Sequence, residues 1–340
     1  MKKFLFIGGA VCLLLGAVAA IYISPAFSSR PIVEAEHELF VPTGADYDTL
    51  LTLLGKEGDI ITDLARFERV ASLKGLHKSV RPGRYLLREG MSAAEVVGTL
   101  RGGMQTPVRL TFNNIRTLPQ LAGRLAEQIE PDSLTLLNHL TSPEVAANYG
   151  FTTEELIGMF LPNTYEVWWT ITPEGLTDRM KKEYDNFWNE ERKAKLVRTG
   201  LTQKEVSTLA SIICEETQMG DEMPTMAGVY INRLRRGMLL QADPTVKFAL
   251  GDFTLRRILN RHLEVDSPYN TYKYAGLPPS PICMPSIRGI EAVLNYKESN
   301  YLYFCAKEDF SGYHNFARTL SEHNRNARRY AAALNRAGIR

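Results

Sequence analysis

Glu216 is the second of two adjacent glutamates that end a stretch predicted to be helical. Thr202, followed three residues later by Glu205, is typical of a capping box at a helix N-terminus, and apolar residues then recur at helical spacing. At about 100° per residue, Glu216 lies roughly 20° from the apolar Leu209, whereas Glu215 lies about 120° from it. The pattern therefore predicts that Glu216, and not its neighbour, lies on the buried face of this helix.

A carboxyl group on a buried helix face suits proton transfer. Burial penalises the ionised form, so the pKa of Glu216 is expected to lie above that of an exposed glutamate. A carboxyl group that stays protonated near neutral pH can act as a general acid. The alternative is a solvated glutamate without a chemical role, which is common near helix ends. The pattern of one helix does not decide between a general acid and a solvated glutamate. The decision depends on the rest of the chain.

The segments that would position Glu216 follow it in the sequence. A second helix is predicted over residues 224–236. Asp243, with a proline after it, forms a favourable N-cap and first-turn pair, so we expect a capping role for it. Gln241 has no such structural role. Residues 267–281 are dense in prolines, aromatic residues and amides, which predicts a rigid polar loop that could form the wall of a groove for an uncharged polymer.

The C-terminal segments alternate between helix and strand. Ser286 is expected to cap a short helix, residues 301–304 and 313–316 are expected to pair as strands, and a second capping box begins a last helix at Thr319. His314 and His323 lie in these segments without the spacing of metal ligands. We therefore predict no metal and no cofactor, and we expect both histidines to be hydrogen-bonded structural residues.

Composition excludes several classes of protein. The 340 residues are 44% hydrophobic, enough for a sizeable core and for two or three domains. The 40 basic and 38 acidic residues give a formal net charge of +2, so no nucleic acid partner is expected. The four cysteines show no C-x-x-C spacing, and one of them lies in an N-terminal apolar run, so a full disulfide framework is not expected.

The N-terminal segment predicts a membrane anchor. Two lysines precede residues 4–23, which contain no charge and are long enough to cross a bilayer as a helix with a cytoplasmic N-terminus. A cleaved signal peptide is the alternative, since residues 17–19 resemble a cleavage site. Either reading exports the remaining chain. We expect a single-pass protein of the bacterial cytoplasmic membrane whose catalytic domain is extracytoplasmic.

The pattern beyond the anchor predicts an α+β protein with three further parts. Residues 1–28 would form the cytoplasmic tail and the anchor, and residues 30–107 a small α+β module without catalytic spacing. Residues 108–199 would form a mainly helical bridging region, which includes an aromatic turn over residues 160–165, and residues 200–340 the catalytic domain.

Seven motifs occur in the order found in one family. They are LASIICEET, VYINRLRRGMLLQADPTV, YNTY, GLPPSPI, YLYF, GYHNFA and EHN. Their order resembles that of the YceG-like endolytic murein transglycosylases, the MltG family, and the similarity extends over nearly the whole chain. The resemblance implies that the module at residues 30–107 is LysM-like and that the C-terminal part is a YceG-like catalytic domain.

The resemblance implies cleavage of peptidoglycan glycan strands, within the strand, between N-acetylmuramic acid and N-acetylglucosamine. It also implies termination of nascent strands beside membrane-bound peptidoglycan synthases, which would be partners. The family's ASIVEKET reads ASIICEET here, so the residue that corresponds to the catalytic acid is Glu216, in agreement with the helical pattern. Glu216 with Thr217 also resembles the Glu-Ser pair of other lytic transglycosylases.

The chain departs from the family in four motifs. Cys214 and Glu215 replace a glutamate and a lysine; the family's TIPEG reads TFNNI, its EGFLFPDTY reads IGMFLPNTY, and its PINNPG-like segment reads PICMPS. Because of these substitutions, the resemblance does not support carrying a site role of the family over to Asn113, Ile157 or Met284.

The mechanism expected from these residues needs one acid. Neutral Glu216 would protonate the leaving glycosidic oxygen, and the carboxylate would then accept a proton from the C6 hydroxyl of the same muramic acid, whose oxygen attacks C1 to give a 1,6-anhydro end. The candidates for binding the sugar are Gln241, Tyr269, Asn270, Tyr272, Ser211, Thr217, His314 and Asn324. Two alternatives remain open: a lysozyme-type muramidase, which hydrolyses the bond with two carboxylates, and a non-enzymatic wall-binding scaffold.

Overall fold

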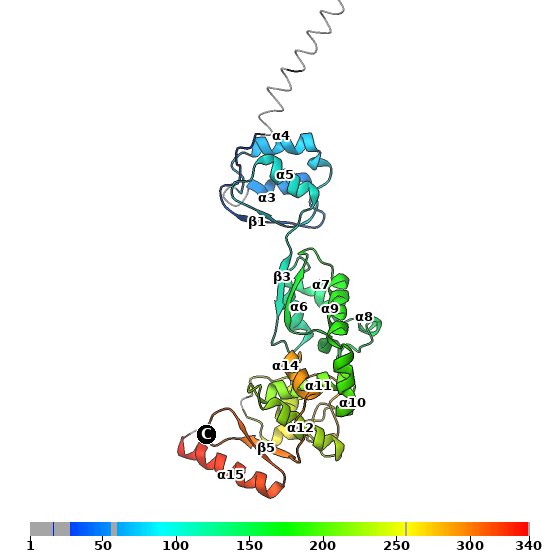
Figure 1. Cartoon of the computed structure of the whole chain (residues 1–340), viewed down its shortest axis with the longest axis vertical. Coiled ribbons are helices and arrows are strands. Elements are labelled where there is room, and N and C mark those ends of the chain that lie inside the picture. Colours follow the sequence, from blue (N-terminus) through cyan, green and yellow to red (C-terminus); the bar gives the residue numbers. More distant parts are fainter. Residues whose placement is uncertain (1–15, 17–27, 56–59, 256, 339–340) are drawn as a thin grey trace, which may run out of the picture. The chain divides into compact units, whose positions relative to one another are not determined.

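The computed structural model describes residues 28–55, 60–255 and 257–338, together with Gly16, and divides into two units (Figure 1). The first unit contains the described residues up to Leu110, with Gln128–Pro131 and Tyr165–Thr172; the second contains the rest. The predicted membrane anchor lies outside the described residues. Among those that are described, no helix is long and apolar enough to span a bilayer.

The first unit is built on a hairpin and three helices. Strand β1 (His37–Val41) pairs antiparallel with β2 (Gly83–Leu87), with Leu39 opposite Tyr85. Helices α3 (Tyr47–Gly55), α4 (Leu64–Lys74) and α5 (Ala93–Gly102) and the short 3-10 turn η2 (Leu76–Lys78) complete it. The apolar residues at alternating strand positions and at helical spacing share one core, which includes Leu39, Val41, Leu50, Leu54, Phe67, Val70, Tyr85, Leu87, Val96 and Val97.

The helices of this unit begin at polar cap residues. Ser92 forms a capping box with Glu95 at the start of α5. Helix α4 begins at the N-cap Asp63 and buries only three residues, Phe67, Val70 and Ala71, among charged neighbours. Three buried residues give only a short apolar pattern in the sequence. Packing of these residues against the core supplies most of the stability of the helix.

The second unit begins with short helices. They are α6 (Leu118–Ala126), α7 (Ser133–Leu140), α8 (Pro143–Asn148), η3 (Leu156–Met159), α9 (Pro173–Phe187) and α10 (Glu190–Thr199). Strands β3 (Val108–Phe112) and β4 (Asn163–Val167) form a two-stranded sheet. The sequence was expected to form an aromatic turn over residues 160–165; the strand β4 begins within this range, because its edge pairs with β3.

The C-terminal part of the second unit surrounds α11 (Gln203–Glu216) with other elements. These are α12 (Met223–Arg235), α13 (Asp243–Leu250), η4 (Asn260–Glu264) and α14 (Ile287–Leu294), followed by strands β5 (Tyr303–Ala306) and β6 (His314–Ala317) and helix α15 (Leu320–Arg336). The capping box of Thr202 and Glu205 begins α11, as predicted. Eight consecutive residues, Val206–Ile213, are buried, so α11 is enclosed on all sides and not only on the predicted apolar face.

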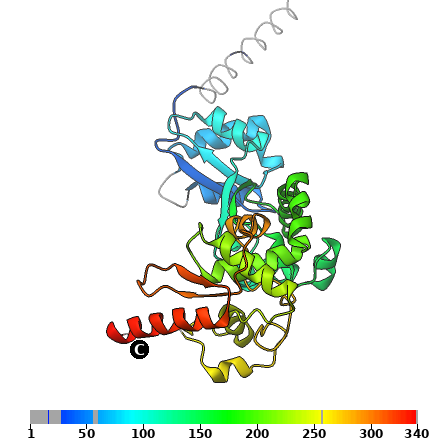
Figure 2. The ribbon, with the colours of Figure 1, turned by 60° about the horizontal axis from the view of Figure 1, so that its bottom comes forward.

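The β5–β6 hairpin and α15 form a second layer. Tyr303 pairs with Ala317 and Ala306 with His314, and Figure 2 shows α15 lying along this hairpin. Thr319 caps α15 through the backbone N–H of Glu322, as predicted. The carboxylate of Glu322 accepts from the backbone of Arg318, so the reciprocal bond of a capping box is not the one formed.

Gly228 allows α12 to approach the backbone of Lys297. A Cβ added at Gly228 would overlap the carbonyl oxygen of Lys297, whereas a Cβ added at Gly123 in α6 would meet no atom within 4 Å. Gly228→Ala is therefore expected to lower the free energy of unfolding by about 1–3 kcal/mol, as overpacking does. Gly123→Ala is expected to raise it by about 0.5–1 kcal/mol, because alanine favours a helix. Urea unfolding measures both, and equal effects of the two substitutions would contradict the close approach.

Candidate active site

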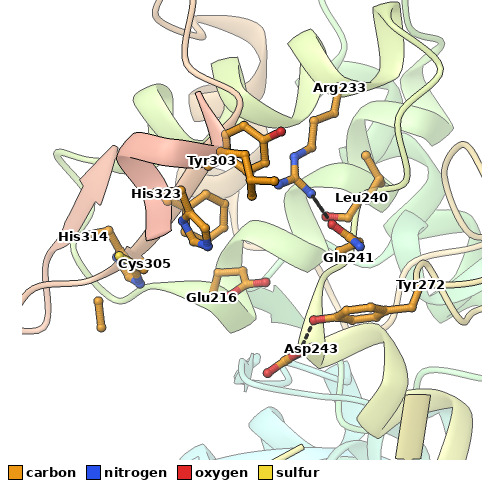
Figure 3. Close-up of a pocket in the computed structure, with 13 residues that line it drawn as sticks. Glu216, Arg233, Leu240, Gln241, Asp243, Tyr272, Tyr303, Cys305, His314 and His323 are labelled. Atoms are coloured by element: carbon orange, nitrogen blue, oxygen red, sulfur yellow. Dashed lines mark hydrogen bonds between the residues drawn. The ribbon is translucent and has the colours of Figure 1, made fainter. Parts of the chain in front are cut away.

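Glu216 lines a cavity of about 370 Å³ in the second unit. Figure 3 shows its carboxylate facing the space that Gln241, Tyr272 and Asp243 also face. The remaining wall comes from α12, the hairpin and α15. The lining residues are Glu216, Arg233, Leu240, Gln241, Asp243, Tyr272, Tyr303, Phe304, Cys305, Ala306, His314, Leu320 and His323.

The end of α11 determines the chemistry of Glu216. Glu216 is the last residue of this buried helix, and its side chain is partly exposed to the cavity. The pKa of its carboxyl group is raised to about 7 from an ordinary value of 4.5. Burial is the main cause, a hydrogen bond from Tyr230 opposes the rise, and the negative charge of Asp243 adds to it. Glu216 can therefore hold a proton near neutral pH and can also release it.

Two residues of α12, Tyr230 and Arg233, hold this region from behind. The Tyr230 hydroxyl donates to Glu216 Oε1 at 2.9 Å, and the side chain of Tyr230 is buried. The buried Arg233 donates from Nη1 to the carbonyl oxygen of Leu240 at 2.8 Å, which fixes the segment leading to Gln241. Neither residue was singled out from the sequence. Their spacing of three along a helix would have placed them on one face, but nothing in the sequence identifies Glu216 and Leu240 as their partners.

Asp243 was expected to cap α13, and this prediction was wrong. The N-cap is Ala242, and Asp243 is the first residue of the helix, with its side chain lining the cavity. Its Oδ1 accepts a hydrogen bond of 2.6 Å from the Tyr272 hydroxyl. The backbone N–H of Ala242, the N-cap residue, donates to the Thr271 hydroxyl at 3.0 Å, and the carboxylate of Asp243 has no capping role. The cavity therefore contains two carboxyl groups.

Glu222 joins three segments beside the cavity. Its Oε1 accepts from the Thr217 hydroxyl at 2.9 Å and lies 2.6 Å from His314 Nδ1, while its Oε2 accepts from the backbone N–H of His314. Glu222 is 6% exposed and Thr217 is 4% exposed. Thr217 thus lies behind the wall and supports it, whereas His314 reaches the cavity. Glu222 was not identified from the sequence, because nothing in its spacing distinguishes it from a surface glutamate.

The two histidines differ. His314 is hydrogen-bonded, as expected, but His323 is not: its Nδ1 is buried without a hydrogen-bond partner in the part of the chain that the structure describes. The ring of His323 stacks on Tyr303 at 5.5 Å. Burial lowers the pKa of His323, and the charge of Arg233 lowers it further. His323 is therefore a neutral ring with an unused nitrogen atom at the cavity wall. No three described His, Cys, Asp or Glu residues are grouped as metal ligands.

Gln241 is held in an uncommon backbone conformation. Its φ is +52°, a region in which non-glycine residues are strained by about 1–3 kcal/mol. Its backbone N–H donates to Thr271, and its side-chain oxygen lies 3.5 Å from Arg233 Nη1. The surrounding structure therefore fixes the amide of Gln241 against the cavity.

Four other candidate residues do not line the cavity. The Tyr269 hydroxyl bonds to Ser280 at 2.6 Å, and the fully buried Asn270 donates to the carbonyl oxygens of Leu263 and Val265. Ser211 is fully buried and accepts from the backbone N–H of Ile282, which fixes the proline-rich loop to α11. Asn324 is exposed on α15. The structure therefore brings Gln241, Tyr272 and His314 together with Glu216; the binding roles of all these candidates stay predictions.

The raised pKa of Glu216 predicts a pH-dependent stability. The folded state keeps its proton up to about pH 7 and the unfolded state loses it near 4.5, so the folded state binds more protons between these values and its stability falls as pH rises through them. Glu216→Gln is expected to remove this fall. The free energy of unfolding of the variant should exceed that of the wild type by about 1–3 kcal/mol at pH 8 and by less at pH 5. Urea unfolding at both pH values measures it; a gain that does not depend on pH would contradict the assignment.

The neighbours of Glu216 predict opposite shifts of its pKa. Tyr230→Phe removes a hydrogen bond that favours the carboxylate, so the pKa of Glu216 should rise. Asp243→Asn removes a nearby negative charge, so the pKa should fall. NMR titration of the Glu216 carboxyl carbon in each variant measures these shifts, and shifts of the same sign would be inconsistent with this geometry.

The chain is similar to several known proteins. An endolytic murein transglycosylase of Bacillus subtilis (strain 168) is 30% identical over 312 residues, covering 87% of this chain and 85% of that protein. One of Streptococcus pneumoniae (strain ATCC BAA-255 / R6) is 28% identical, covering 84% of this chain and 57% of that protein. The crystal structure of a putative yceG-like protein from Listeria monocytogenes superposes with a TM-score of 0.56 at 28% identity, over 86% of this chain and 99% of the other.

The family itself is established by its sequence profile. The profile of the YceG-like family matches residues 39–329, which include every residue that lines the Glu216 cavity. The motifs identified in the sequence lie within the same range. The chain therefore belongs to the YceG-like family.

Proposed function

We propose that the chain is an endolytic lytic transglycosylase of peptidoglycan. It cleaves the bond between N-acetylmuramic acid and N-acetylglucosamine within glycan strands and leaves 1,6-anhydro ends. The Bacillus subtilis relative, which is of similar length, carries the name endolytic murein transglycosylase, and this supports the substrate class. The single observation that carries the chemistry is the carboxyl group of Glu216, with a pKa of about 7, in a cavity walled by aromatic rings and amide groups.

Glu216 serves first as acid and then as base. In its neutral form it donates its proton to the glycosidic oxygen as the bond from C1 to that oxygen breaks. The resulting carboxylate accepts the proton of the C6 hydroxyl, and O6 forms a bond to C1, so that no water enters the product. A pKa near 7 suits both steps, since the group must give and take a proton at the same pH. The Tyr230 hydroxyl supports the carboxylate formed between the two steps.

Asp243 and the polar wall have supporting roles in this scheme. Positive charge develops at C1 as the leaving group departs, and an ionised Asp243 would stabilise it electrostatically. Gln241, with its strained backbone, and Tyr272 are placed to bind sugar hydroxyl or acetamido groups. The ring of His323, stacked on Tyr303, contributes to the same wall of the cavity.

A muramidase is the second candidate, and Asp243 is the observation that favours it. Hydrolysis with two carboxyl groups needs an acid and a second carboxylate on the other side of the bond. Asp243 lines the same cavity as Glu216 and would fill the second role. The two reactions differ in one respect, because a hydrolase adds water to the product and a transglycosylase does not.

The rest of the chain belongs to the same proposal. The N-terminal residues 1–28 would anchor the protein in the bacterial cytoplasmic membrane with its catalytic domain, residues 200–340, outside the cytoplasm. Residues 30–107 would be a LysM-like subdomain that contacts the wall, and residues 108–199 a bridging region. Peptidoglycan synthases would be its partners, since an enzyme anchored beside them can cut strands as they are made.

Product analysis tests the reaction. Digestion of glycan strands by the wild type should give anhydro ends, which are lighter by one water than hydrolysis products, and Glu216→Gln should reduce cleavage by about 100-fold or more because the proton donor is lost. Glu205→Gln is the matched control on the same helix, because glutamine preserves a capping box. Mass spectrometry of the products decides. Products heavier by one water would favour the muramidase, and absence of cleavage by the wild type would favour the scaffold. Cleavage by the wild type that Glu216→Gln leaves unchanged would contradict the role of Glu216 as the acid.

A further inference from the structure

A second cavity, of about 480 Å³, lies beside the end of α11 in the second unit. It shares no lining residue with the cavity of Glu216. Its apolar base is buried, and its rim carries amides and guanidinium groups. The lining residues are Asn113, Asn114, Ile115, Arg116, Pro162, Cys214, Glu215, Gln218, Met223, Cys283, Met284, Ser286 and Arg288.

The two cavities are joined by adjacent residues of one helix. Glu215 lines the second cavity and Glu216 the first. Arg116 Nη2 lies 2.7 Å from Glu215 Oε2, and its guanidinium lies 4.9 Å from the ring of Phe253. Phe253 packs in turn on Phe248 of α13, the helix that begins with Asp243 of the first cavity. The end of α11 therefore borders both cavities.

The rim of the second cavity has an excess positive charge. Two guanidinium groups, of Arg116 and Arg288, face one carboxylate, that of Glu215, and this carboxylate is already paired with Arg116. Arg288 makes no ion pair within the described ranges. The exposed amides of Asn113 and Asn114 likewise have no hydrogen-bond partner among the described residues. The rim thus offers one unpaired guanidinium and two unused amides.

The base of the cavity restricts what can bind. Ile115, Met223 and Met284 are buried, and no aromatic residue lines the cavity, so it lacks the stacking surface that Tyr272 and Tyr303 give the first cavity. Burial raises the pKa of the Cys214 and Cys283 thiols, so they stay protonated and are poor metal ligands. An apolar base with amides and one guanidinium at its rim fits a short peptide with a carboxylate.

The proposed substrate carries such a group next to the reacting bond. In peptidoglycan the peptide is attached through the lactyl group of muramic acid, the sugar whose C1 is attacked. The peptide must therefore leave the strand close to Glu216. The second cavity is also where this sequence departs from the motifs it otherwise resembles, since residues 113–115, 214–215, 283, 284 and 286 all line it.

We propose that the second cavity binds the peptide of the muramic acid at the cleavage site, and that Arg288 pairs with a carboxylate of that peptide. The amides of Asn113 and Asn114 bind the peptide backbone, and the buried base receives a small apolar side chain. This inference rests on the proposed function. It assigns to Arg288 a role in substrate choice, and none in proton transfer.

The test compares glycan strands that carry peptides with strands from which an amidase has removed them. For the full chain, Arg288→Ala should lower kcat/KM about 10-fold to 100-fold on peptide-bearing strands, as expected for the loss of a charged hydrogen bond, and leave peptide-free strands nearly unaffected. Arg288→Lys should restore part of the loss, because it keeps the charge without the planar fork. Arg328→Ala, an exposed residue of α15, is the matched control.

Direct binding gives a second measurement. N-acetylmuramic acid carrying a dipeptide should bind more tightly with a free carboxylate than with that carboxylate amidated, and Arg288→Ala should remove the difference. Equal losses of kcat/KM on both kinds of strand, no loss on either, or equal binding of both ligands by the wild type would overturn the proposal. Failure of the wild type to form anhydro ends would instead reject the proposed function. The binding measurement with the two muramyl dipeptides would still show whether the second cavity binds a peptide carboxylate.

Discussion

The carboxyl group of Glu216 lies where a helix with a buried centre meets a cavity. Its surroundings leave it too little water to ionise easily, yet the Tyr230 hydroxyl and the cation of Arg233 keep the ionised form within reach. The remaining elements of the second unit maintain this balance. If α11 were exposed on one side, water would solvate the carboxylate and the pKa would return to its ordinary range.

Helix α12 is the main support of this arrangement. It carries Tyr230 beneath the acid and Arg233 beneath the segment that ends at Gln241, and it approaches the Lys297 backbone closely at Gly228. Glu222, just before this helix, holds the end of α11 to strand β6 through Thr217 and His314. The cavity wall is thus fixed by hydrogen bonds between segments that are distant in the sequence, which agrees with a site that must be organised before the substrate arrives.

The sequence predicted those features that depend on interactions between residues close to one another along the chain. The cap at Thr202, the helical face of Glu216 and the hairpin from Tyr303 depend on neighbours within a few residues, and the structure contains all three. The order of the motifs indicated the family. Asp243 was misassigned because a cap can be inferred from two adjacent residues, whereas its real partner, Tyr272, lies 29 residues away. Tyr230 and Glu222 were missed for the same reason, since only tertiary contacts distinguish them from ordinary residues.

The adjacent positions of Glu215 and Glu216 also limit the insertions and deletions that helix α11 can accept. Helix α11 extends for 14 residues from a cap that fixes its start, so the side chain at each position points in a set direction. One deleted residue between the cap and the acid would turn the C-terminal end by about 100° and point the carboxyl group of Glu216 into the second cavity. One inserted residue would instead point the carboxyl group of Glu215 into the first cavity. Substitutions within α11 that preserve volume can be tolerated, but a change in its length cannot. The spacing between Thr202 and Glu216 should therefore outlast the identity of most residues between them.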